Sequence, residues 1–143
     1  MNSSRPPWAR AIAVDLWGLC LMSCSHNSPT VPEAEYSTKV VGNWQGTVGR
    51  QKETMSINGD GTFVCRVQPM GFLARTLFQK MPRTVYGTWK ITGAVITLTI
   101  TGAENESLRK RITPSKIMAF KTDELVLKSD GGETSPFRRV SAR

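Results

Sequence analysis

A chain of 143 residues with a formal charge of +8 is long enough for one domain and too short for several. The positive charge suits anionic partners such as phospholipid head groups, lipopolysaccharide, cell-wall polymers or nucleic acid, and it equally suits a surface that only keeps the protein soluble. The single histidine, His26, excludes the usual Ser-His-Asp and Cys-His catalytic arrangements in the body of the chain.

Residues 1–23 are expected to be a cleaved signal peptide. Arg5 and Arg10 precede a mostly apolar stretch, residues 11–22, which is shorter than the roughly 20 residues that a membrane-spanning helix needs. The stretch runs into Leu21-Met22-Ser23-Cys24, which resembles the bacterial lipobox, a leucine three residues before a cysteine with a small residue directly before it. The resemblance implies that Cys24 becomes the lipid-bearing N-terminus. The alternative is an ordinary N-terminal segment that happens to contain a cysteine.

The other cysteines agree with export and acylation. Cleavage would remove Cys20 and acylation would use Cys24, so Cys65 alone would remain and no internal disulfide could form. Ser25 stands where an aspartate usually favours retention at the inner membrane, so we expect a cell-envelope location, lipid-anchored at the outer membrane and facing the periplasm.

The segment after the cysteine has the composition of a linker. Residues 24–38 contain Pro29, Pro32 and many small polar residues. Such a segment buries little apolar surface, so we expect a flexible tether over residues 24–38 and a single folded domain over residues 39–143.

From Lys39 onward, apolar and polar residues alternate with a period of two, which is typical of half-buried strands. The clearest run is 95–101, where Ile96, Leu98 and Ile100 share one face and three threonines share the other. The same alternation places Cys65 on an inward face. The pattern predicts strands at residues 40–48, 54–57, 62–67, 84–92, 95–101, 108–113, 116–121, 124–129 and 135–141.

Residues that tolerate a positive φ separate these strands, at 58–61, 92–94, 122–124 and 130–132. About eight strands joined by short connections predict an antiparallel meander, and closure into a barrel removes its two exposed edges. We therefore expect an all-β fold, a small antiparallel up-and-down barrel with one short helix.

The helix is expected between Gly71 and Met81, because Leu73 and Leu77 are four residues apart and Pro82 ends the segment. A helix here could plug one end of the barrel, form a lid over a cavity, or present a basic amphipathic face to lipid.

Several short motifs occur in an order that resembles the bacterial lipocalin-like domains, many of which are lipoproteins of unassigned function. They are, in chain order, Gly42-Asn43-Trp44, Asn58-Gly59-Asp60-Gly61-Thr62-Phe63, Tyr86-Gly87-Thr88-Trp89-Lys90-Ile91-Thr92-Gly93, Leu98-Thr99-Ile100, Thr122-Asp123-Glu124-Leu125-Val126-Leu127 and Phe137-Arg138-Arg139-Val140. The resemblance covers about residues 40–140 and implies that Trp44 closes the barrel floor near Arg138 or Arg139. The domain is shorter than an ordinary lipocalin, so its interior side chains could fill it.

The sequence contains few residues in arrangements suited to catalysis, and we expect no enzyme activity, no cofactor and no metal. Carboxylates fall in turns or loops rather than as an inward-facing pair suited to general acid–base catalysis: Asp60, Glu104, Glu106, Asp123, Glu124 and Asp130. Cys65 has no histidine to activate it, and no His/Cys cluster has the spacing of a metal site.

Two functional hypotheses remain. The first is a membrane-anchored, non-enzymatic barrel that binds a small apolar ligand or an envelope component, with Trp44, Phe63, Trp89 and Leu98 as candidate ligand-binding residues. The alternative is a structural or interaction lipoprotein whose basic face contacts anionic envelope polymers or a protein partner. Its candidate residues are Arg109, Lys110, Arg111, Arg138 and Arg139, which closure would place on neighbouring strands or one strand apart. A nucleic-acid-binding barrel survives only if the signal is not cleaved, so nucleic acid is not an expected partner.

Overall fold

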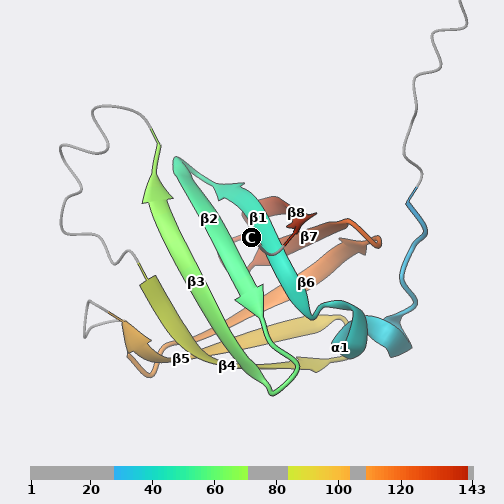
Figure 1. Ribbon diagram of the computed structural model, residues 1–143, viewed down its shortest axis with the longest axis horizontal. Helices are drawn as coiled ribbons and strands as arrows, with labels where there is room; N and C mark the ends of the chain where they lie inside the picture. Colours follow the sequence, from blue (N-terminus) through green and yellow to red (C-terminus); the bar gives the residue numbers. More distant parts are fainter. Residues whose placement is uncertain (1–27, 71–83, 104–108, 142–143) are drawn as a thin grey trace, which may run out of the picture.

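The computed structural model describes residues 28–70, 84–103 and 109–141, and its eight strands form one closed antiparallel barrel (Figure 1). Each strand pairs with the next in the chain, and the last pairs with the first, so the predicted all-β up-and-down barrel is confirmed. The strands are β1 (Gly42–Val48), β2 (Gln51–Ile57), β3 (Thr62–Pro69), β4 (Thr84–Thr92), β5 (Val95–Ala103), β6 (Ile112–Phe120), β7 (Glu124–Ser129) and β8 (Thr134–Val140).

The short helix of the described residues is α1 (Tyr36–Lys39), which follows the 3-10 turn η1 (Glu33–Glu35). The helix expected between Gly71 and Met81 lies outside the described residues. Within the described ranges, no helix is both long enough and apolar enough to cross a membrane.

Strand β6 corrects one sequence expectation, because it runs unbroken where two strands were predicted on either side of Pro114. Proline ends most internal strands because it lacks a backbone N–H. On the β7 side, however, pairing begins only at Ser115, which lies opposite Ser129, so Pro114 has no β7 partner. Further along, a register shift between Ile117 and Ala119 lets both Ile117 and Phe120 face the interior.

One end of the barrel is filled by large apolar side chains. The turns at 58–61, 93–94 and 121–123 all lie at this closed end, since they join the ends of β2, β4 and β6 to the next strand. The largest fully buried side chains are Trp44, Phe63, Phe120, Ile57, Ile96, Leu125 and Val40. The indole ring of Trp44 stands edge-on to Phe120 at 5.8 Å between ring centroids and donates a hydrogen bond to the Val40 carbonyl oxygen at 2.7 Å.

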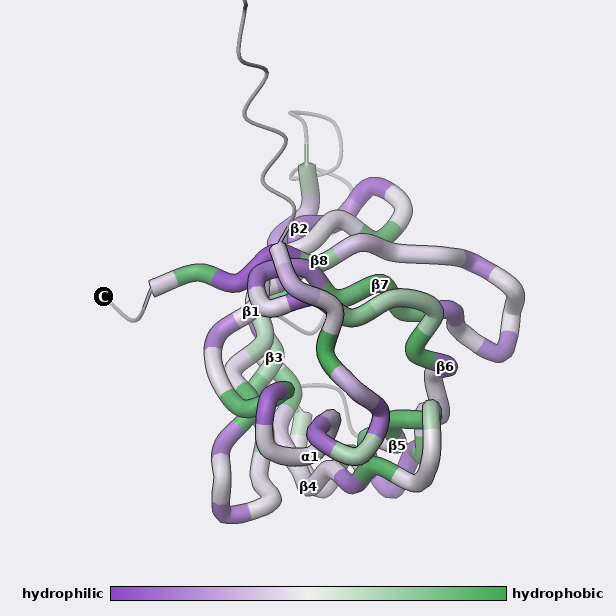
Figure 2. Tube along the Cα trace, turned by 90° about the vertical axis from the view of Figure 1, so that its right-hand side faces the viewer, coloured by the Kyte–Doolittle hydropathy of each residue, from purple (hydrophilic) through white to green (hydrophobic). Residues whose placement is uncertain are grey.

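The chain before β1 covers this closed end and is not a tether over its whole length. Val31 is buried and donates a backbone hydrogen bond to the Phe120 carbonyl at 2.9 Å, while Thr122 donates one to the Pro29 carbonyl at 3.1 Å. The Tyr36 ring packs on Phe120 at 5.2 Å. Figure 2 views the barrel from the side that carries α1.

The expected tether over residues 24–38 is therefore wrong for residues 29–38, and the folded domain begins about ten residues earlier than the expected residue 39. The physical reason is that two side chains of this polar segment, those of Val31 and Tyr36, pack with Val40, which follows it, over the aromatic rings of the closed end. Residues 24–27 lie outside the described part of the chain.

Arg139 joins three separate segments at the closed end. Its Cζ lies 4.3 Å from the centroid of the Trp44 ring, so the guanidinium stacks on the indole. Its N–H groups donate to the carbonyl oxygens of Val41 at 2.9 Å and Thr122 at 2.8 Å, and also to that of Lys39. The contact between Trp44 and the chain end is thus confirmed for Arg139. Gly42 permits it, because a Cβ there would lie 2.4 Å from Nη1 of Arg139.

Replacing Arg139 by lysine tests this arrangement. Lysine keeps the charge but has no planar group to stack on Trp44 and no fork of donors to reach three carbonyls. We expect Arg139→Lys to lower the free energy of unfolding by about 2 kcal/mol, measured by urea denaturation. Arg138→Lys, at the exposed neighbouring position, is the matched control and should cost less than about 0.5 kcal/mol. Equal effects of the two substitutions would contradict the role of Arg139.

Candidate functional site

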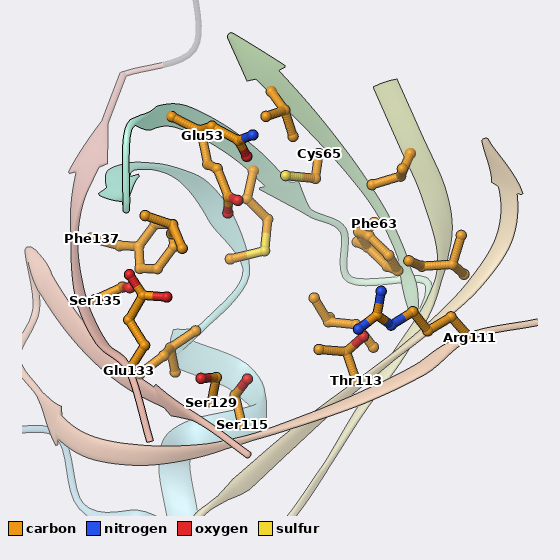
Figure 3. A pocket seen from close by; sticks show the side chains of 18 residues that line it. Glu53, Phe63, Cys65, Arg111, Thr113, Ser115, Ser129, Glu133, Ser135 and Phe137 are labelled. Carbon is orange, nitrogen blue, oxygen red and sulfur yellow. The ribbon is translucent and has the colours of Figure 1, made fainter. Parts of the chain in front are cut away.

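The other half of the barrel encloses a cavity of about 420 Å³ (Figure 3). It lies toward the open end, where the β1–β2 and β7–β8 turns are found and where β3 and β5 end. The residues that line it come from all eight strands and the adjoining turns: Val48, Gln51, Glu53, Met55, Phe63, Cys65, Val67, Val85, Leu98, Ile100, Arg111, Thr113, Ser115, Leu127, Ser129, Glu133, Ser135 and Phe137.

The interior is hollow here because the inward positions of this half hold short side chains. Thr113, Ser115, Ser129 and Ser135 all line the cavity and extend only one or two heavy atoms beyond Cβ. Gly46 on β1 has a different role, since a Cβ there would lie 2.7 Å from the Phe137 ring, so the glycine lets Phe137 pack directly on the β1 backbone. The expectation that side chains could fill the whole barrel is therefore wrong for this half.

The cavity has an apolar wall and a polar wall. Strands β2 to β5 contribute mostly apolar groups, with Met55, Phe63 and Ile100 among them, whereas β6 to β8 contribute four hydroxyl groups. Such a combination of a large apolar surface with a few polar groups is typical of small-molecule sites.

The structure brings together two of the four residues predicted to bind a ligand. Phe63 and Leu98 both line the cavity. Trp44 instead lies in the floor beneath it, and it is fully buried. Trp89 is at the closed end, where its indole N–H donates to the Asn58 carbonyl at 2.9 Å, so it does not line the cavity. Alternation indicates which face of a strand a residue occupies, but not how far along the barrel axis that residue lies.

The five residues predicted to form a basic patch lie at opposite ends of the barrel. Arg109, Lys110 and Arg111 precede β6 at the open end, whereas Arg138 and Arg139 are near the end of β8, where Arg138 lies opposite Glu124 at the closed end. The clusters belong to strands β6 and β8, which are one strand apart, as expected. These two strands run in the same direction, and one cluster precedes β6 whereas the other lies near the end of β8, so the clusters are at opposite ends of the barrel. Arg111 lines the cavity, and Arg139 is bound to the closed-end carbonyls.

Two carboxylates of the described residues face the cavity, which corrects the expectation that no acidic pair lies on an inward face. Glu53 is on β2 and Glu133 directly precedes β8, and both of these strands pair with β1. The signal for Glu53 was present in the sequence, because it stands two residues before Met55 and four before Ile57 on the same face of β2. Glu133 lies in the β7–β8 turn, where alternation gives no orientation.

Burial and repulsion act together on Glu53. Burial raises the pKa of its carboxyl group, and the nearby charge of Glu133 raises it further. Burial likewise raises the pKa of the Cys65 thiol to about 12, with a smaller contribution from Glu53. Cys65 is therefore a neutral packing group at neutral pH and not an activated nucleophile, as its predicted inward position implied.

In the part of the chain that the structure describes, no group of three or more His, Cys, Asp and Glu side chains is placed to hold a metal ion. The described part of the lining thus offers an apolar surface, hydroxyl groups, one guanidinium and two carboxylates. These groups can bind and orient a small molecule.

In comparisons with known proteins, no protein-family model matches this sequence, and no curated protein matches it.

The raised pKa of Glu53 predicts how stability depends on pH. Because the folded state binds this proton more tightly than the unfolded state, stability falls as the pH rises through the window between the two pKa values. Glutamine cannot ionise, so Glu53→Gln should raise the thermal midpoint at pH 7 and change it little at pH 4. Glu35→Gln, at an exposed position in η1, is the control and should be neutral at both pH values. A stabilisation of equal size at both pH values would contradict the account.

Proposed function

We propose that this protein is a membrane-anchored, non-enzymatic lipocalin-like barrel that binds one small, largely apolar ligand in its open half. The observation that carries the proposal is the cavity of about 420 Å³, with Met55, Phe63 and Leu98 in its lining. Cavities of roughly 300–1,000 Å³ with a mainly apolar lining are the usual size and character of small-molecule sites.

The architecture supports the lipocalin-like part of the proposal. The resemblance implies an antiparallel barrel with its strands in consecutive order, and the eight strands have this order. It also implies that the tryptophan of the Gly-x-Trp motif lies near an arginine of the last strand, and Trp44 lies under Arg139. The alternative function, a basic face that contacts anionic polymers, lacks comparable support because its two clusters lie at opposite ends of the barrel.

The lipobox supports anchoring in the cell envelope, at the outer membrane and facing the periplasm. Acylation at Cys24 would leave only residues 25–28 before the segment that packs on the closed end at Pro29. An extended chain of this length reaches about 15 Å. The closed end would then lie close to the membrane, and the mouth of the cavity would face away from it.

Binding can be tested with N-phenyl-1-naphthylamine, a neutral apolar dye whose fluorescence rises in apolar surroundings, on the full chain carrying Cys24→Ser so that no acyl chain competes. We expect saturable binding to one site. Val67→Trp places an indole in the cavity and should weaken binding about tenfold or more. Val64→Trp, three residues earlier on β3 and on its outward side, is the matched control and should leave binding unchanged. Absence of saturable binding, or equal loss in both variants, would contradict a ligand site in the barrel.

Anchoring can be tested separately by labelling a bacterial host with an alkyne analogue of palmitate. We expect the wild-type chain to incorporate the label and to fractionate with membranes, because Cys24 carries the acyl chains. Cys24→Ser should abolish both properties, whereas Cys20→Ser should preserve them, since Cys20 would be removed with the signal. Labelling that persists in Cys24→Ser would contradict acylation at this residue.

A further inference from the structure

The two carboxylates that line the cavity approach it from either side of β1. Glu53 lies opposite Gly46 of β1 in the strand pairing, and Gly46 in turn lies opposite Phe137 of β8. Glu133 precedes β8, and a Cβ at Gly49 in the β1–β2 turn would lie 3.8 Å from one of its carboxylate oxygens. Figure 3 shows both carboxyl groups directed into the cavity.

These carboxylates lie at different depths. Glu133 is exposed, so it marks the mouth of the cavity. Glu53 is half-buried and lies one inward position deeper than Gln51, and the next inward position after it is the buried Met55. A ligand that extends along the axis from Glu133 toward Met55 would therefore pass the Glu53 carboxylate before it reaches the apolar floor.

Among the residues that the structure describes, the charged groups that face Glu53 do not neutralise it. Glu133 on the β8 side repels it, and the Cys65 thiol on β3 is neutral at physiological pH. Arg111 is the cationic residue among the described residues of the lining, but it precedes β6, which lies across the ring of eight strands from β2. In Figure 3, Arg111 extends into the cavity from the side opposite the two carboxylates.

The cavity therefore has an acidic side in a protein whose formal charge is +8. A buried carboxylate is costly unless a positive group compensates it, and a cationic ligand would supply that group. A protonated amine between the two carboxylates would make charge-assisted hydrogen bonds, while an attached apolar group would cover Met55, Phe63 and Leu98.

We propose that the ligand of this cavity is an amphipathic amine, whose ammonium group binds between Glu53 and Glu133 and whose apolar body lies against the β2–β5 wall. This assignment rests on the proposed function, that the cavity binds a small apolar molecule, and adds the chemical class of its polar group.

The test uses three probes with the same eight-carbon chain, namely octylammonium, octanol and octanoate, titrated at pH 8 into the full chain carrying Cys24→Ser. Binding is followed by NMR or by displacement of N-phenyl-1-naphthylamine. We expect octylammonium to bind about tenfold more tightly than octanol, and octanoate to bind more weakly than octanol.

Variants assign the difference to the carboxylates. Glu53→Gln should reduce the preference for octylammonium over octanol to less than about threefold, with octanol binding unchanged, and Glu133→Gln should reduce it by a smaller factor because Glu133 is exposed. Glu35→Gln lies at the closed end, away from the cavity, and should leave all three affinities unchanged.

The outcomes separate the two proposals. If none of the three probes binds, the ligand site itself is wrong and both proposals fail. If octanol binds as tightly as octylammonium, or if the preference persists in Glu53→Gln, the cavity binds apolar ligands but the assignment of an amine is overturned. If octanoate binds most tightly, Arg111 and not the carboxylate pair selects the ligand, and the assignment is likewise overturned.

Discussion

The stacking of Arg139 on Trp44 is the interaction on which the rest of the structure depends. The same guanidinium donates hydrogen bonds to carbonyls of Lys39, Val41 and Thr122, so one side chain joins the last strand, the chain before β1 and the β6–β7 turn. Burial lowers the pKa of Arg139, and the three carbonyl oxygens and the ring face compensate for the water that the guanidinium gives up. A barrel must join its first strand to its last, and here the side chains at that junction also close one end.

A firmly packed end allows the other half of the barrel to remain hollow. An empty cavity in an apolar core lowers protein stability by about 24 cal/mol for each Å³. A cavity with a polar wall costs less, because water or a ligand can occupy it. The large rings of Trp44, Phe63 and Phe120 gather at the closed end and in the floor, while serine and threonine occupy the inward positions of β6 to β8 nearer the mouth. Local departures from an ideal core are expected where function requires them.

Period-two alternation predicted the strands well, because successive side chains of a strand point to opposite faces and only one face is buried. The bounds of β4 and β7 agree with the sequence expectation at every residue. Alternation carries no information about position along the barrel axis, which is why Trp89 was misplaced relative to the cavity and the two arginine clusters were misplaced relative to each other. Glu53 lies on the same face as Met55, two residues later, but the predicted strand began only at residue 54 and so left Glu53 out. The packing of Val31 on Phe120 depends on a partner about ninety residues away in the chain, which no local pattern reveals.

The central claim is that the open half of the barrel receives a ligand whose apolar part reaches Met55. Intermolecular nuclear Overhauser effects from the alkyl chain of bound octylammonium to the protein methyl groups measure this directly. The account predicts effects to Met55, Leu98 and Ile100, whose side chains line the cavity. Effects confined to the exposed side chains of Ile112 and Met118 would place the ligand on the outer surface and would contradict it.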